Sequence, residues 1–214
     1  MVYTKDLKSF AARLASSSLA PGTIIMTNEK ITYQGKIIEV VEYSPDGTRT
    51  FELARRAPGT RTIICVDDDI LLTREHRHEI DGYDYRLPGG KVFDKLTEYN
   101  DFLSTNPTDD QKLDAARAGA IRELREEVGI DATPEELGFL YKSVCGATVE
   151  WDLYYFVIKV AADRLQKQQL EDGEDIALQT VSRDEARKLA LNAAKMSEDR
   201  SVAVLLRFLE SSND

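Results

Sequence analysis

Three carboxylates near the middle of the chain are spaced so that they could share a metal ion. Glu123, Glu126 and Glu127 stand at positions i, i+3 and i+4, and a helix would place them on one face. A hard divalent cation such as Mg²⁺ would relieve the repulsion between them, because it prefers carboxylate oxygen and water. Arg122 precedes Glu126 by four residues and could hold its carboxylate. The same run is also typical of a solvated helix surface.

A pair of glycines provides a second feature that could do chemistry. The segment Leu87–Gly90 reads Leu-Pro-Gly-Gly and follows a strand-like stretch. Glycine lets a backbone approach a ligand closely and can expose carbonyl oxygens to a metal ion. Such a segment is often a simple turn, but together with the carboxylate helix it indicates a metal-dependent site.

The two segments together resemble the Nudix box, whose pattern is Gly-x5-Glu-x7-Arg-Glu-(apolar)-x-Glu-Glu-x-Gly-(apolar). Arg122–Ile130 matches the second half at every defined position, and Gly90 matches the opening glycine. Asp114 stands where the pattern has Glu. Residues 91–113 provide 23 positions where the pattern has five, so the chain carries an 18-residue insertion, at about 94–111.

The resemblance implies an α/β fold, the Nudix-type α/β/α sandwich with a mixed sheet, and it implies Mg²⁺ (or Mn²⁺) as cofactor. Carried over to this chain, it makes Glu123 and Glu127 the principal metal ligands. Glu126 would be an additional ligand, and the carbonyl of Gly89 a further contact.

From about residue 37 onward the chain resembles the ADP-ribose pyrophosphatase branch of the family. In that branch an acidic loop before the last strand supplies the carboxylate that orients or deprotonates the attacking water. Asp172 and Glu174 are the matching positions, and Glu174 is the first choice. The remaining candidates for this catalytic role are Glu171 and, on the helix, Glu126. Without the resemblance, an acidic loop is usually just solvated.

The same resemblance indicates substrate contacts. Arg77 falls where the branch has an arginine that reaches the diphosphate, and Glu52 falls near a position that contacts the base. Phe51 replaces an arginine found in some members. Arg55 and Arg56 are further candidates for phosphate contacts, although each arginine could equally form a surface ion pair.

The implied reaction is metal-assisted hydrolysis of a diphosphate linkage in a nucleoside diphosphate derivative, with ADP-ribose giving AMP and ribose 5-phosphate. A nucleoside diphosphate sugar pyrophosphatase is the alternative, because residues 144–153 lack the Pro-Gly-rich loop common in the ADP-ribose branch. A non-catalytic nucleotide-sensing Nudix protein is less favoured, since such proteins usually have a damaged glutamate face and an added DNA-binding domain. A Nudix isomerase would need catalytic Cys and Glu outside the box, and Cys65 and Cys145 offer no clear match.

Hydrophobic periodicity and turn signals predict the elements that position these residues. We expect a small β-subdomain at 22–56, within an N-terminal unit 1–56 that precedes a hydrolase domain at 57–214. Further strands are expected at 61–66, 70–74, 138–145, 151–160 and 175–181. Helices are expected at 5–18, 108–128, 183–190 and 199–210. Thr108 with Gln111, and Ser182 with Glu185, form capping-box patterns.

Two chemically suggestive groups are interpreted as structural. Asp67–Asp69 lies between two strand-like runs and is expected to form a hairpin turn. Trp151, Tyr154 and Tyr155 could stack on a base, but aromatic residues in an apolar strand are more often part of the core.

Composition limits the partners. The formal net charge of −10 argues against a broad nucleic-acid surface, which needs clustered Lys and Arg. An acidic site can still bind a polyanion when divalent cations lie between them. No run approaches 18 apolar residues, so no membrane span is expected. The small β-subdomain, with its exposed strand edges, favours a homodimer.

Cysteine usage bears on location. Cys65 and Cys145 both lie in apolar runs and are expected to be buried free thiols, which suits a reducing compartment. We therefore expect a cytoplasmic protein. The Ser-rich, mildly basic start is compatible with a transit peptide, whereas Asp6 and the spacing of Leu7, Phe10 and Leu14 favour an ordinary surface helix.

Overall fold

The computed structural model describes residues 29–170 and 173–211, so the helix expected at 5–18 lies outside the described residues. The strands are β1 (Lys30–Gln34), β2 (Ile38–Tyr43), β3 (Phe51–Arg56), β4 (Gly59–Val66), β5 (Asp69–Arg77), β6 (Gly82–Arg86), β7 (Gly138–Ser143), β8 (Val149–Glu150), β9 (Leu153–Val160) and β10 (Ile176–Val181). The helices are α2 (Leu96–Ser104), α3 (Asp109–Glu123), α4 (Arg183–Ala190) and α5 (Asp199–Ser211), with a π-turn at Leu124–Val128 and a 3₁₀ turn at Ala162–Arg164.

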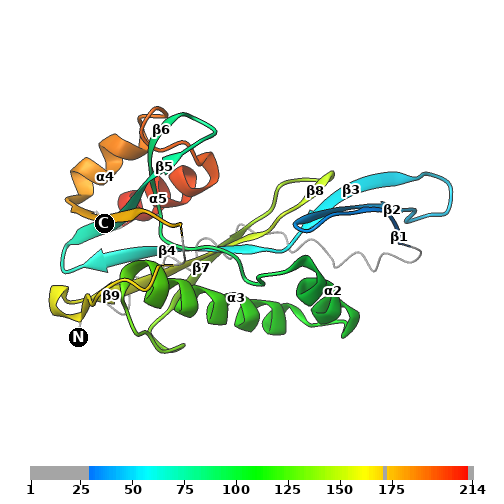
Figure 1. The fold of residues 1–214 in the computed structure, drawn as a ribbon, viewed down its shortest axis with the longest axis horizontal. Coiled ribbons are helices and arrows are strands. Elements are labelled where there is room, and N and C mark those ends of the chain that lie inside the picture. The colour runs from blue at the N-terminus through cyan, green and yellow to red at the C-terminus, as the bar shows by residue number, and fades with distance from the viewer. Residues whose placement is uncertain (1–28, 171–172, 212–214) are drawn as a thin grey trace.

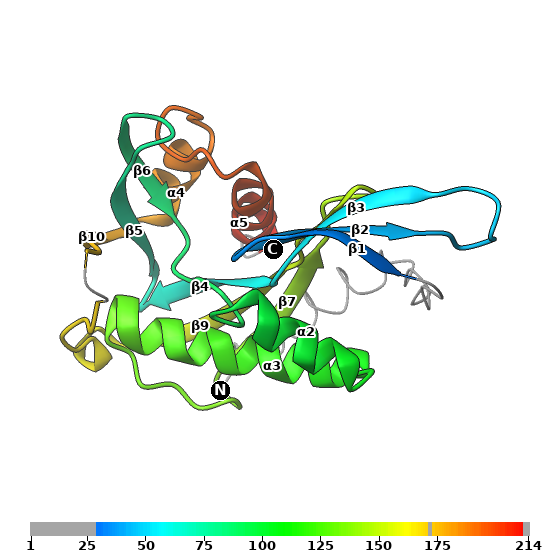
Figure 2. The same cartoon turned by 45° about the vertical axis from the view of Figure 1, so that its right-hand side comes forward.

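The larger sheet is mixed and lies between two helical layers. Its strand order is β10-β5-β4-β9-β7, with β6 paired to β5. β4 and β9 run parallel, and the other pairs are antiparallel. Helix α3 covers one face of this sheet, and α4 and α5 cover the other (Figures 1 and 2). This arrangement is the α/β/α sandwich expected from the sequence.

Strand β4 shows why the sheet is covered on both faces. All eight of its residues are buried. Side chains alternate between the two faces of a strand, so Ile63 and Cys65 pack in the core beneath α4 and α5. Ile64 and Val66 pack in the core beneath α3. The second half of the strand is therefore apolar on both faces, whereas its first half carries the buried polar residues Thr60, Arg61 and Thr62.

Helix α3 begins and ends as its sequence predicts. The Thr108 side chain accepts a hydrogen bond from the backbone N–H of Gln111, and the Gln111 side-chain oxygen accepts one from the Thr108 N–H. The apolar stripe that helical spacing predicts faces the sheet core, and it consists of Leu113, Ala116, Ala120, Leu124 and Val128. Leu113 is partly buried and the other four are buried. The helix closes through the π-turn onto Gly129, which has a φ of 72°. A side chain there would meet the Gln166 carbonyl at 2.3 Å, so this turn requires glycine.

The smaller sheet has the order β1-β2-β3-β8 and projects from one end of the sandwich (Figure 1). The three strands expected in 22–56 are present. The fourth strand, β8, comes from the later part of the chain and pairs in parallel with β3. The two sheets are therefore linked at β8, while the boundary at residue 56 stays a prediction.

The insertion contains a helix that the sequence analysis did not predict. Helix α2 packs beside the root of the smaller sheet: the Tyr99 hydroxyl donates to Glu150, and the Asn100 amide donates to the buried Glu39. The Phe93 ring lies 5.2 Å from that of Phe102 and 5.5 Å from that of Tyr99, and Phe93 packs against the core beneath α3. The insertion thus braces the smaller sheet against the body of the protein.

The structure agrees with the expected turn between β4 and β5 and with the cap of α4, but not with the expected burial of both cysteines. Asp67 takes a φ of 52° between β4 and β5, as expected for a hairpin turn. Ser182 accepts the hydrogen bond from the Glu185 backbone, so the first half of that capping box is present. The expectation that both cysteines are buried is wrong for Cys145, which is exposed after β7 ends at Ser143.

The buried face of α5 differs from the apolar stripe that its sequence predicts, which is Val202, Leu205, Leu206 and Leu209. Val204 and Phe208 join Leu205 and Leu209 in the core, whereas Val202 and Leu206 are only partly buried. Within residues 29–170 and 173–211, no helix is long and apolar enough to cross a membrane.

Candidate functional site

The Gly89–Gly90 turn is fastened to strand β4. The Thr60 N–H donates to the Gly90 carbonyl and the Thr62 N–H to the Pro88 carbonyl, each at 2.9 Å. Gly89 has a φ of 141°, and a side chain there would meet the Thr60 carbonyl oxygen at 2.3 Å. The turn can lie this close to β4 only because position 89 has no side chain.

Two carboxylates from the end of α3 and the π-turn meet this glycine turn. Glu127 Oε2 accepts a 2.7 Å hydrogen bond from the Gly89 N–H. Glu123 lies against Gly90, where an added Cβ would come within 2.5 Å of its Oε1. A π-turn inside a helix is often found at functional sites. Here it ends the helix beside the glycine turn, so Glu123 and Glu127 come together as expected.

Burial makes both carboxyl groups weaker acids than an ordinary glutamate. Burial raises the pKa of Glu127 to about 8; the Gly89 hydrogen bond opposes this shift and the charge of Glu123 adds to it. Burial also raises the pKa of Glu123, with Arg122 opposing and Glu126 and Glu174 adding. A low-dielectric position beside a like charge disfavours ionisation. A cation placed between the two carboxylates would reverse that preference.

Arg122 and Glu126 form the outer rim of this group. Arg122 Nη2 donates to the Lys91 carbonyl at 2.7 Å and to Glu123 Oε1 at 3.2 Å. Its Nε lies 3.8 Å from Glu126 Oε2, so the expected link between Arg122 and Glu126 is present. The Glu126 side chain is 31% exposed and is held by Arg122 at the rim, outside the contact between Glu127 and the glycine turn.

The acidic loop lies within electrostatic range of the buried pair. The negative charge of Glu174 contributes to the raised pKa of both Glu123 and Glu127, although Glu174 is far from them in sequence. Asp172 and Glu171 lie outside the described residues. The structure therefore brings Glu174 toward the carboxylate pair, while its catalytic role stays a prediction.

Arg77 lines a cleft of about 350 Å³ beside this loop. The other lining residues are Glu75, His76, His78, Glu79, Gly173 and Asp175. Arg77 pairs with Glu75 at 2.8 Å, and its buried Nε has no hydrogen-bond partner. The volume falls within the range of small-molecule sites. Because Gly173 and Asp175 flank Glu174, the cleft adjoins the loop that faces the carboxylates.

The other proposed substrate residues are Arg55, Arg56 and Glu52, and they have different surroundings. Neighbouring residues of a strand point to opposite faces, so Arg55 and Arg56 do not act together. Arg55 is held by Glu29, Glu39 and Glu150. The interpretation of Arg55 as a phosphate contact stays a prediction, and three carboxylates already pair with this buried guanidinium.

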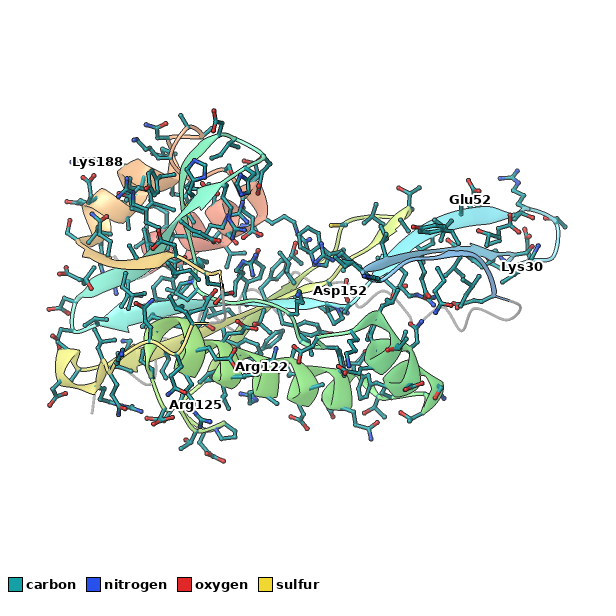
Figure 3. The ribbon with its side chains drawn as sticks, viewed as in Figure 1. Lys30, Glu52, Arg122, Arg125, Asp152 and Lys188 are labelled. Carbon is teal, nitrogen blue, oxygen red and sulfur yellow. The ribbon has the colours of Figure 1, made fainter. Side chains whose placement is uncertain are left out.

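Arg56 lies 4.3 Å from the centroid of the Trp151 ring. Its Nε is buried without a partner, and burial together with the charge of Arg61 lowers the pKa of this guanidinium. Glu52 is exposed on the projecting sheet, whereas Arg122 lies on α3 in the body of the protein (Figure 3). Within one chain, Glu52 is not brought to the carboxylate pair.

Sequence reasoning missed two residues that contact this site. Arg61 is buried in β4 and donates to the Gly89 carbonyl and to Glu198, which precedes α5. An arginine within the apolar run at 61–66 was the available signal, but nothing local identified Glu198 as its partner. Tyr154 and Tyr155 are core residues, as interpreted, and Trp151 is only partly buried.

The donor set fits a hard divalent cation. No group of three or more His, Cys, Asp or Glu side chains is arranged as a metal site in the two described ranges. Glu123 and Glu127 nevertheless present buried carboxylate oxygens that Arg122 and the Gly89 N–H only partly stabilise, and carboxylate oxygens are the donors that Mg²⁺ and Mn²⁺ prefer. The Gly89 carbonyl accepts from Arg61 and keeps a second lone pair. Its contact with a metal stays a prediction.

Comparison with known proteins agrees with this geometry. The family model of the NUDIX domain matches residues 55–201. The crystal structure of an ADP compounds hydrolase matches with a TM-score of 0.57 and 20% sequence identity, covering 86% of this chain and 91% of that chain. At this identity the likeness concerns the fold. A search of curated proteins finds no match.

Proposed function

Because the chain belongs to the Nudix family, we propose that it hydrolyses the diphosphate linkage of a nucleoside diphosphate derivative in a reaction that depends on Mg²⁺ or Mn²⁺. The proposed substrate is ADP-ribose, giving AMP and ribose 5-phosphate. The observation that carries the proposal is the buried pair Glu123 and Glu127 beside the Gly89–Gly90 turn, with the charge of Glu174 facing them. The structural likeness to an ADP compounds hydrolase supports the choice of substrate.

The residues have separate roles in this proposal. Glu123 and Glu127 hold the divalent cation, with Glu126 as an outer ligand. The cation, when bound, supplies charge neutralisation for the diphosphate. Glu174 takes the proton of the attacking water, which requires only hydrogen-bond reach. Arg77, whose Nε is unpartnered at the cleft, contacts the diphosphate.

Arg56 is the second proposed phosphate contact. Its buried Nε lacks a partner, and among the described residues no carboxylate forms an ion pair with it. An unpaired guanidinium in a chain of net charge −10 is a suitable ligand for a phosphate oxygen. Trp151 supports its planar group from one side.

The test is a hydrolysis panel of ADP-ribose, nucleotide sugars, dinucleoside polyphosphates and nucleoside triphosphates, each with Mg²⁺, Mn²⁺ or EDTA. We expect cation-dependent release of AMP from ADP-ribose. Preference for a nucleoside diphosphate sugar would assign the alternative substrate on the same site. Nucleotide binding without hydrolysis of any substrate would overturn the enzymatic proposal in favour of a sensor.

Glu127→Gln is the matching variant. It removes a carboxylate charge while keeping the side-chain shape and an acceptor for the Gly89 N–H, so the fold is expected to persist. We expect turnover to fall about 100-fold or more at saturating Mg²⁺. Glu185→Gln, which removes an exposed carboxylate on α4, serves as the control. Near wild-type turnover of Glu127→Gln would reject this assignment.

We also propose that the protein is a cytoplasmic homodimer that does not act on nucleic acids or membranes. Exposed apolar side chains on the smaller sheet support the dimer, and they include Ile31, Tyr33, Ile38, Phe51 and Val149. Two free cysteines, one of them exposed, support a reducing location. Subcellular fractionation of cells producing the untagged chain tests the location.

A further inference from the structure

A buried arginine connects the glycine turn to the start of the last helix. Arg61 on β4 donates from Nε and Nη2 to the two oxygens of Glu198, each at 2.9 Å. Its Nη1 donates to the carbonyls of Thr60 and Gly89, also at 2.9 Å. We name Arg61 and Glu198 the clamp. Four hydrogen bonds to a planar guanidinium fix its position and its plane.

The clamp is shielded from solvent. The side chains of Arg61 and Glu198 are 10% and 11% exposed. Glu198 also accepts a hydrogen bond from the fully buried Ser201, whose hydroxyl lies 3.2 Å from that of Tyr155. The Glu198 carboxylate thus accepts hydrogen bonds from Arg61 and from Ser201. Water does not compete for a geometry of this kind as it does for a surface ion pair.

One glycine joins the clamp to the carboxylate pair. The carbonyl of Gly89 accepts from Arg61, and the N–H of the same residue donates to Glu127. A change in the orientation of Gly89 therefore alters both bonds. Gly89 has no freedom to move toward β4, because it already lies against the Thr60 carbonyl. The backbone bonds from Thr60 and Thr62 hold the residues on either side of Gly89, and Arg61 holds the Gly89 carbonyl itself, whose peptide group carries the chain toward the bond with Glu127.

The identity of the two residues is hard to explain by stability. Replacing a buried ion pair with apolar residues of similar volume is often neutral or stabilising, and both side chains of this pair are largely buried. An apolar pair could not hold the Gly89 carbonyl. Lysine has three donors on one nitrogen and could not make these four hydrogen bonds, two of which run side by side to the carboxylate.

We propose that Arg61 and Glu198 are positioning residues of the metal site, which fix the Gly89 turn so that Glu127 is pre-aimed at a divalent cation. The proposal rests on the proposed function. The clamp does not contact the substrate or the cation. It acts as an outer layer, and loss of such partners costs about 10- to 100-fold in metal affinity.

The experiment measures binding of Mn²⁺ alone to the full chain by electron paramagnetic resonance, in parallel with unfolding by urea. Glu198→Gln keeps the side-chain shape and leaves Arg61 without its counter-charge. We expect its Mn²⁺ dissociation constant to rise about 10- to 100-fold. With substrate, the metal concentration for half-maximal rate should rise, while the Michaelis constant for substrate at saturating metal stays near wild type.

The double variant Arg61→Met with Glu198→Leu separates positioning from stability. A purely structural role predicts that apolar replacement restores both stability and Mn²⁺ affinity. If the clamp positions the metal site, the double variant regains its free energy of unfolding but does not regain its Mn²⁺ affinity. Asp84→Asn is the matched control: Asp84 is a buried carboxylate that pairs with Arg86 and holds Ser197, next to Glu198, without touching Gly89. Its Mn²⁺ affinity should be unchanged even if its stability falls.

The outcomes are distinguishable. Wild-type Mn²⁺ affinity in Glu198→Gln and in the double variant overturns the clamp and leaves the proposed function intact. Absence of Mn²⁺ binding to the wild-type chain overturns the proposed function itself. An equal loss of affinity in Asp84→Asn also overturns the clamp, because it attributes the effect to general loosening of the segment before α5.

Discussion

Glu123 and Glu127 are carboxylates buried against a backbone turn, and their negative charge is only partly compensated. Arg122 compensates Glu123 in part, and the Gly89 N–H compensates Glu127. Neither partner prevents the rise in pKa that burial produces. Acid groups with pKa values raised by burial and like charge are typical of functional sites.

The acidity of Glu127 makes the stability of the metal-free protein depend on pH. With a pKa of about 8 when folded, against about 4.3 for an ordinary Glu, the folded state holds a proton that the unfolded state has released. Folding is therefore favoured at low pH, and this contribution is lost as pH rises from about 5 to 8. Glu127→Gln lacks this group. In EDTA, the free energy of unfolding of the wild type should fall relative to Glu127→Gln over that range. Parallel pH profiles would contradict the assignment.

Glu174 is expected to act in the chemical step rather than in holding the metal. It lies on a loop instead of the helix, and its charge reaches both buried carboxylates. Glu174→Gln should lower the turnover number strongly and leave the Mg²⁺ dependence and substrate affinity nearly unchanged. Steady-state kinetics over a Mg²⁺ titration tests this. If turnover recovers at high Mg²⁺, Glu174 is a ligand and the base must be sought at Asp172, Glu171 or Glu126.

Single residues differ in how far the sequence could identify them. Glu123 and Glu127 were predictable because helical spacing places them on one face, whatever surrounds that face. Arg55 and Arg56 were not distinguishable, because the strand alternation that separates them does not say which face meets Glu39 and which meets Trp151. Arg61 and Glu198 are 137 positions apart, and no local pattern links such residues.

At the scale of elements, the site depends on two chain reversals that both need glycine. Gly89 brings the turn onto β4, and Gly129 ends the π-turn in a left-handed conformation. The boundaries of α3 could be predicted, because its cap and its closing glycine act locally. The π-turn and helix α2 could not, since the first depends on the docking of the helix end and the second on contacts with Glu39 and Glu150.

Gly90→Ala tests the contact between the glycine turn and α3. The added Cβ would lie 2.5 Å from a Glu123 carboxylate oxygen. Because the clash is with the end of a flexible side chain, the fold should persist while Glu123 moves away. We expect weaker Mn²⁺ binding and lower activity with a small change in unfolding free energy. Gly82→Ala, whose added Cβ would lie 3.6 Å from the Ile80 carbonyl oxygen, is the control. Equal Mn²⁺ affinity in the two variants would reject this reading of the contact.

At the scale of the whole molecule, a sandwich with its own core carries a thin projecting sheet (Figures 1 and 2). The sandwich buries apolar side chains on both faces of its sheet. Most of the large apolar side chains exposed in the described residues lie on the smaller sheet or its first turn. Gathered exposed apolar groups mark interaction surfaces. Alternation along β1 to β3 predicted these strands, but not β8, whose pairing joins distant parts of the chain.

A second copy of the chain is the proposed partner of this sheet. A small sheet with exposed edges and apolar side chains is stabilised by pairing or packing with another surface. We expect a homodimer at micromolar concentration, measured by light scattering after size-exclusion chromatography. Tyr33→Asp with Ile38→Asp places two charges on this sheet and should give a monomer with a folded sandwich. Leu191→Asp, at a residue 69% exposed beyond α4, should remain a dimer. A monomeric wild type, or a double variant that stays dimeric, would show that the smaller sheet does not form the interface. In that case its exposed apolar side chains would need another partner.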